Sequence, residues 1–137
     1  MQEENYVSFY TAILLKEKHF IGRCHKCYYQ YKEDNNKVCL EDIHGDSGEV
    51  EAPTLQMAMD WLRDEHKIHI SIMPNRTEND FYIELYRKDT IYGGWEPLTD
   101  DDGTLVYTGE TPLTINYNSY EAAADTAIQY VLKNFVK

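Results

Sequence analysis

Two cysteines three positions apart form the sharpest local motif in this sequence. The segment CHKC, residues 24–27, has the Cys-x-x-Cys spacing, in which one tight turn aims two thiolates at one metal ion. Cys39 and His44 would complete a tetrahedral set with Cys24 and Cys27, with the spacing C-x2-C-x11-C-x4-H. A small structural zinc-binding domain is therefore one functional hypothesis, and it requires these four side chains to converge.

The same cysteines have a plainer explanation as ordinary free thiols. A redox-active Cys-x-x-Cys pair is expected to open a helix after a strand, whereas tyrosine-rich β sequence follows this one. The chain has three cysteines, and an odd number argues against a framework of disulfides. This cysteine content is typical of a protein from a reducing compartment.

A histidine and a glutamate on neighbouring strands are the second candidate for chemistry. Residues 68–73 and 81–87 both alternate apolar and polar side chains, as half-buried strands do. An antiparallel pairing about the loop PNRTEN brings polar side chains together on one face and apolar ones on the other. The predicted pairs are Ile72 with Phe81, Ile70 with Ile83, Ile68 with Leu85, Ser71 with Tyr82, and His69 with Glu84. A general base with an orienting carboxylate would make the protein an enzyme, which is the third hypothesis.

A capped helix runs directly into the first of these two strands. Thr54 is the predicted N-cap, and an apolar stripe follows at helical spacing, formed by Leu55, Ala58, Met59 and Leu62. Trp61 widens that stripe, so we expect it to be helical and buried. The apolar period changes from 3.6 to 2 after His66, where the strand begins.

The remaining elements are read from caps and turns. Ser8 predicts a helix over residues 9 to about 18, and Asn118 or Ser119 predicts the start of a last helix. Asn35 and Asn36 tolerate positive φ, so a two-residue hairpin turn there would place Tyr31 opposite Leu40. Extended segments are also expected at 104–108 and 113–117.

Together these elements predict an α+β fold in one domain, residues 1–137. We expect an antiparallel sheet of about four or five strands, with three helices packed on one face. The two later helices start alike, with a hydroxyl cap after strand-like sequence, which suggests two hairpin-plus-helix units.

The balance of charge limits the classes of partner. The formal net charge is -11, which disfavours nucleic acid and anionic membranes, because both are bound by clustered basic residues. No apolar run approaches the roughly 20 residues of a membrane span, and the acidic N-terminus is unlike a signal peptide. We therefore expect a cytoplasmic protein whose partner is a protein.

The sheet face without helices would be the binding surface. Aromatic side chains dominate protein interfaces, because they bury a large area and keep a polar handle. The predicted surface comprises Tyr82, Tyr86, His69 and Glu84 on the second hairpin, Tyr28 on the first, and Tyr92 and Trp95 in loops. Its partner would be another protein or a second copy of this chain.

Three blocks of the sequence resemble a family of small uncharacterised proteins encoded by phages and prophages of gut anaerobic bacteria. The blocks are SFYTAILLKEKHF, APTLQMAMDWLRDEHKIHI and YEAAADTAIQYVLKNF, and the second is the most distinctive. The resemblance implies no known activity, cofactor or catalytic residue. It does imply an origin in a mobile element, so the leading hypothesis is a non-catalytic accessory protein that acts through protein contacts.

Overall fold

The structure is a computed structural model that describes residues 5–45, 48–75, 78–99 and 116–137. Its elements in chain order are α1 (Phe9–Glu17), β1 (Lys26–Tyr31), β2 (Lys37–Asp42), β3 (Val50–Ala52), α2 (Leu55–His66), β4 (Ile68–Pro74), β5 (Phe81–Lys88), β6 (Trp95–Pro97) and α3 (Tyr120–Asn134). This mixture of helices and antiparallel strands confirms the α+β class. The predicted strand 104–108 and most of 113–117 lie outside the described residues.

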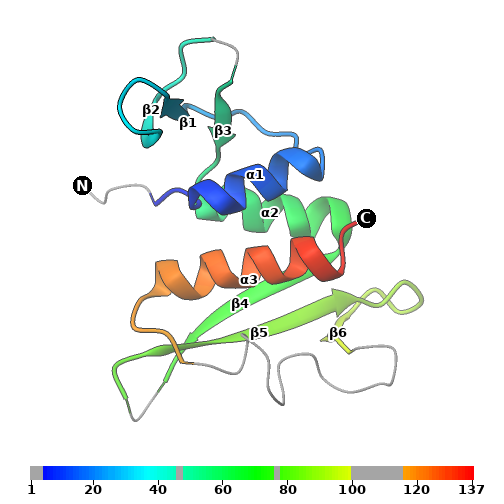
Figure 1. Ribbon diagram of the computed structural model, residues 1–137. Coiled ribbons are helices and arrows are strands. Elements are labelled where there is room, and N and C mark those ends of the chain that lie inside the picture. Colours follow the sequence, from blue (N-terminus) through cyan, green and yellow to red (C-terminus); the bar gives the residue numbers. More distant parts are fainter. Residues whose placement is uncertain (1–4, 46–47, 76–77, 100–115) are drawn as a thin grey trace.

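The described strands form two antiparallel sheets with the helices between them (Figure 1). The first sheet has the order β2-β1-β3, and the second has the order β4-β5-β6. We expected one sheet. Two form because α2 separates β3 from β4 in the chain and packs against β4, while α1 packs against β3.

Each helix begins at a hydroxyl residue that the sequence identified as a cap. The side-chain oxygens of Ser8, Thr54 and Ser119 each accept a hydrogen bond from the third backbone N–H of their helix. Of the two caps predicted for α3, Ser119 takes the position and Asn118 does not. These caps fix where the helices start, and therefore which side chains face inward.

The core lies among the three helices and the inner face of the second sheet. The stripe predicted on α2 is buried, and it packs with apolar residues of α1, α3, β4 and β5. Trp61 is helical but only half-buried, so the expectation of full burial is wrong. Its ring lies at the border of the stripe, where it packs edge-on against Phe20, with 5.3 Å between ring centroids.

Helices α1 and α3 are joined by one carboxylate. Asp125 of α3 accepts hydrogen bonds from the backbone N–H of Ser8 at 2.9 Å and from its Oγ at 2.8 Å. Gln129 Nε2 donates to the same carboxylate at 2.9 Å and to Thr11 Oγ1 at 2.9 Å. Because Thr11 is fully buried, this network satisfies polar groups that water does not reach.

The β4–β5 hairpin has the predicted faces but not the predicted register. Ile70 lies opposite Leu85 instead of Ile83, and His69 lies opposite Tyr86 instead of Glu84. The pairing continues to Pro74, opposite Phe81, where we expected the strand to have ended. A shift of two positions preserves the alternation of faces, so the isoleucines still point inward.

The first hairpin also has a different turn from the one predicted. Asn35 and Asn36 do adopt positive φ, 54° and 60°. The loop, however, spans residues 32–36, so Tyr31 pairs with Lys37 instead of Leu40. This shift is odd, so it moves Cys39 to a position opposite Tyr29.

Candidate functional site

Most of the predicted surface residues lie together on the face of the second sheet that is turned away from the helices. We call this the outer face. Its residues are His69, Ser71 and Met73 of β4, Tyr82, Glu84 and Tyr86 of β5, and Trp95 of β6. They gather there because β-strand side chains alternate, and the isoleucines of β4 occupy the opposite, buried face.

Aromatic rings line the part of the outer face nearest β6. The ring of His69 lies 6.4 Å from that of Tyr86 and 5.7 Å from that of Trp95, measured between centroids. A shallow hollow of about 470 Å³ is bordered by these three rings and by Arg63, Ser71, Met73 and Glu84. Trp95 remains 45% exposed, so this hollow presents a large apolar ring to the surroundings.

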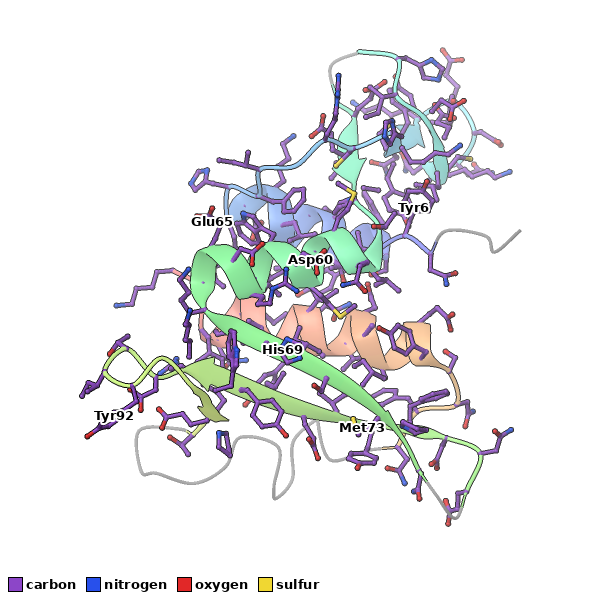
Figure 2. All side chains as sticks on the ribbon, turned by 180° about the vertical axis from the view of Figure 1, so that it is seen from behind. Tyr6, Asp60, Glu65, His69, Met73 and Tyr92 are labelled. Atoms are coloured by element: carbon purple, nitrogen blue, oxygen red, sulfur yellow. The ribbon has the colours of Figure 1, made fainter. Side chains whose placement is uncertain are left out.

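The turn that joins β5 to β6 carries the most exposed aromatic residue of the candidate surface. Tyr92 is 86% exposed and its neighbour Ile91 is 80% exposed. Asp89 holds this turn, because its Oδ1 accepts hydrogen bonds from the N–H of Ile91 at 2.7 Å and of Tyr92 at 3.2 Å. The N–H of Gly93, at φ 79°, donates to the Asp89 carbonyl at 2.9 Å. Figure 2 shows Tyr92 far from the helices.

Tyr28 does not belong to this surface, and its assignment there is wrong. It lies in β1 of the first sheet, where its hydroxyl donates to the carbonyl oxygen of Val7 at 2.6 Å. Its ring packs on Phe9 of α1, with centroids 5.5 Å apart. Burial raises the pKa of the Tyr28 hydroxyl. Tyr28 is therefore a structural contact between the first sheet and α1.

His69 and Glu84 do not form the predicted base and orienting carboxylate. Glu84 lies opposite Ser71, and its carboxylate accepts a hydrogen bond from the hydroxyl of Tyr86. His69 packs between the rings of Tyr86 and Trp95 instead. Although both residues border the hollow, no carboxylate in the described part of the chain is placed to orient the ring of His69.

The four predicted zinc ligands do not converge. Cys27 is fully buried in β1 opposite Glu41, whereas Cys39 lies two positions before Glu41 in β2, opposite Tyr29. Within the described part of the chain, which includes Cys24 and His44, no three metal-ligating side chains are grouped to hold an ion. The described residues thus form no tetrahedral donor set at the Cys-x-x-Cys motif.

The surroundings of the cysteines also favour the protonated thiol. Burial, and secondarily the charge of Glu51, raises the pKa of Cys24 from 9.0 to about 11. Burial also raises the pKa of Cys27, with Glu49 adding to the effect. Because the thiolate is the form that binds metals and attacks electrophiles, neither role is favoured here.

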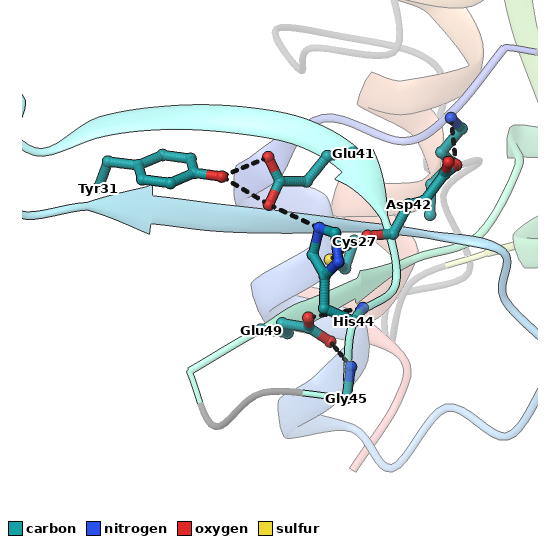
Figure 3. Close-up of polar contacts among 8 residues, drawn as sticks. Cys27, Tyr31, Glu41, Asp42, His44, Gly45 and Glu49 are labelled. Carbon is teal, nitrogen blue, oxygen red and sulfur yellow. Dashed lines mark hydrogen bonds and ion pairs between the residues drawn. The ribbon is translucent and has the colours of Figure 1, made fainter.

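The polar residues near these cysteines hold the first sheet and its loop together (Figure 3). The hydroxyl of Tyr31 donates to both carboxylate oxygens of Glu41, at 2.8 and 2.6 Å. His44 Nε2 lies 3.4 Å from Glu41 Oε1, and the Glu49 carboxylate accepts from the backbone N–H of His44 and Gly45. His44, predicted as a metal ligand, is thus a loop residue among carboxylates.

Three residues of the surface were missed by sequence reasoning. Met73 is the last residue of the predicted strand and lies two positions after Ser71, so following the alternation to the end of that strand would have found it. Ile91 is an apolar residue just before two turn-forming glycines, which is an unusual place for it. Arg63 gave no signal, because it reaches the hollow from α2 past the edge of β4.

Comparisons with known proteins give neither a family nor a structural relative for this chain. Neither a protein-family model, nor a curated protein, nor a solved structure matches it. Within the described residues, no helix combines the length and apolar character needed to cross a bilayer. Function must therefore be argued from the surface itself.

Proposed function

We propose that this chain is a non-catalytic protein-interaction factor, an accessory protein of a mobile element that acts in the cytoplasm. Its contact surface is the outer face together with the turn that carries Ile91 and Tyr92. The origin in a mobile element rests on the resemblance of the three sequence blocks to phage and prophage proteins. The mode of action rests on the surface.

One observation carries the proposal: two large apolar side chains are held in solvent by an ordered turn. Ile91 and Tyr92 are 80% and 86% exposed, and Asp89 accepts hydrogen bonds from both of their backbone N–H groups. Full burial of such a side chain stabilises a complex by about 1.5–3 kcal/mol. A turn fixed before binding also loses little conformational entropy when a partner covers it.

The charge of the chain supports a basic protein as the partner. With a net charge of -11, this protein attracts a positively charged surface and repels an acidic one. On the outer face, Glu84 is acidic and Lys88, which lies opposite Trp95 and outside the lining of the hollow, is basic. The Arg63 that borders the hollow is paired with Asp60 and Asp64 at 3.3 and 3.0 Å. The hollow therefore adds little positive charge of its own to oppose a basic partner.

The experiment that tests this function compares partner capture by matched variants. The double variant Ile91→Ser/Tyr92→Ser removes both exposed side chains and should lose the partner proteins that the parent chain recovers from a bacterial lysate. Ile21→Ser is the control, because Ile21 is 84% exposed but lies in the connection between α1 and β1. Both variants should unfold at the parent temperature, since exposed side chains contribute little to stability.

Two results would contradict the proposal. If the double variant captures the same proteins as the parent, Ile91 and Tyr92 are not part of the contact. If Ile21→Ser loses them equally, the capture reflects exposed apolar residues in general and not this surface.

A further inference from the structure

Among the described strands, none pairs with the edge of β4 that faces away from β5. β4 ends the sheet order β4-β5-β6, so within the described residues it pairs with β5 alone. Figure 2 views the molecule from the side on which α2 and β4 lie. This edge is seven residues long, Ile68–Pro74, and an exposed edge of that length invites another strand.

The hydrogen bonds between β4 and β5 show which backbone N–H and C=O groups of β4 point away from β5. Lys88 N–H donates to the carbonyl of Lys67, and Asn75 N–H donates to that of Asp80. Residues 67 and 75 of this strand are therefore in hydrogen-bonded pairs with β5, and so are the odd-numbered residues between them. The backbone N–H and C=O groups of Ile68, Ile70 and Ile72 consequently point away from β5.

The strand itself carries no charged side chain that would discourage pairing, and the charged residues beside it, Asp60 and Arg63, come from α2. Its sequence, IHISIMP, contains no lysine, arginine, aspartate or glutamate. One edge strand of the first sheet, β2, differs because it carries Lys37, Glu41 and Asp42. The proline of β4 lies at its very end, where it leaves the three isoleucine N–H groups in place.

We propose that a second copy of this chain pairs with β4 through this edge, across a two-fold axis beside Ile70. In that arrangement Ile70 lies opposite Ile70 of the second copy, and Ile68 lies opposite Ile72. Each of the three isoleucines then donates one backbone hydrogen bond to the β4 strand of the other copy and accepts one from it. The two second sheets join into one continuous sheet, with their buried isoleucine faces on the same side.

The edge itself carries no charge, so it offers a basic peptide no acidic side chain, whereas the equally neutral edge of a second copy matches it. Two chains that each carry -11 can approach only where the contact itself is neutral, and the β4 edge is neutral. A basic peptide would gain little there, because the nearest carboxylate on α2, Asp60, is already 3.3 Å from the Arg63 guanidinium. Beside the edge lies a small hollow of about 200 Å³; its lining includes Gln56, Asp60, Arg63, His69, Ile70 and Tyr120.

This inference goes beyond the proposed function, since it uses a different surface and a different partner. Measurement of mass in solution should give twice the 16.1 kDa of one chain at high protein concentration. Amide hydrogen exchange at that concentration should protect Ile68, Ile70 and Ile72 like the ladder amides of His69 and Ser71. Dilution to the monomer should remove the protection of the isoleucine amides alone.

Two variants at one position separate the backbone from the side chain. Ile72→Pro removes an outward N–H that β5 does not use, so it should give a folded monomer. Ile72→Ala loses comparable packing but keeps the N–H, so it should still dimerise. If Ile72→Pro does not fold, the concentration dependence of amide hydrogen exchange in the parent chain still tests whether β4 pairs with a second copy.

Three results would overturn the inference. A monomeric mass at the highest soluble concentration excludes the pairing, whatever the exchange pattern. A dimer with rapidly exchanging isoleucine amides places its interface elsewhere. A folded Ile72→Pro variant that dimerises like the parent shows that these backbone groups are not shared between copies. In none of these cases is the contact through Ile91 and Tyr92 affected.

Discussion

Cys24 is the residue whose chemistry the fold changes most clearly. Burial, reinforced by Glu51, raises its pKa from 9.0 to about 11. The folded state therefore binds this proton more tightly than the unfolded chain does. The stability contributed by the neutral thiol is fully present below about pH 9 and is lost as pH rises through 11.

The alkylation rate of Cys24 should follow this shift. In the folded protein, modification by iodoacetamide should keep rising with pH towards about 11, whereas in denaturant it should level off above about 9. Glu51→Gln should lower the pKa and speed the reaction at a fixed mildly alkaline pH, as peptide mass spectrometry would measure. Equal pH profiles for folded and denatured protein would contradict this account.

Trp61 illustrates what residue spacing leaves undetermined. The stripe from Leu55 to Leu62 was predicted from its spacing, and it is buried. A residue at the border of a stripe is buried only if other groups cover it, and here Phe20 and His66 cover part of Trp61. Spacing gives the direction of a side chain, whereas its burial depends on distant parts of the chain.

The junction between α2 and β4 contains a strained residue. Lys67 caps the helix in the left-handed conformation, at φ 59°, which costs a non-glycine residue about 1–2 kcal/mol. Its side chain is exposed and its Nζ donates to the carbonyl of Asp64 at 2.6 Å. Strain at this point is what lets a strand follow the helix without a loop.

Lys67→Gly should therefore stabilise the protein by about 1 kcal/mol, because glycine adopts this conformation without steric cost. Urea denaturation would measure the gain. The control is Arg63→Gly within the helix, which should destabilise by about 1 kcal/mol. A destabilised Lys67→Gly variant would mean that the bond to Asp64 outweighs the backbone strain.

Sequence predicted those features of the helices and strands that depend on local chemistry. The helix starts were found because a cap and its amide lie three residues apart. The β4–β5 register was missed because Pro74 was read as the end of the strand. Residue 74 points its backbone nitrogen outward, so the missing N–H costs no ladder bond and pairing continues to Phe81.

The candidate surface was predicted in part for the same reason. The correct alternation placed His69, Tyr82, Glu84 and Tyr86 on one face despite the wrong register. Tyr28 was misplaced because its face depends on how the first sheet packs against α1, and that contact spans 21 residues to Val7. No local pattern reports such a contact.

The molecule as a whole carries a charge that acts oppositely on its two proposed contacts. Pairing between copies brings two acidic bodies together, so salt should strengthen it by screening their repulsion. Salt should instead weaken the attraction of a basic partner, because it screens the attraction between opposite charges. The Debye length falls from about 30 Å at 0.01 M to about 8 Å at 0.15 M, a range in which both effects should be large.

Sedimentation at the two salt concentrations would measure the dimer, and capture experiments would measure the partner. We expect the dimer fraction to rise and the captured partner to decrease between 0.01 and about 0.15 M salt. If both change in the same direction, net charge does not govern the two contacts.

The hydrogen bonds from Ser8 to the Asp125 carboxylate can form only after α3 has been synthesised. Ser8 and Asp125 are 117 residues apart, and a ribosome adds about 5–20 residues per second. The N-terminal cap of α1 therefore lacks its acceptor for on the order of ten seconds after it is made. During that interval the apolar side of α1, with Ala12 and Leu15, has no α3 to cover it. Nascent chains stalled before Asp125 should thus be cut by protease within α1, whereas chains with all of α3 outside the ribosome should resist.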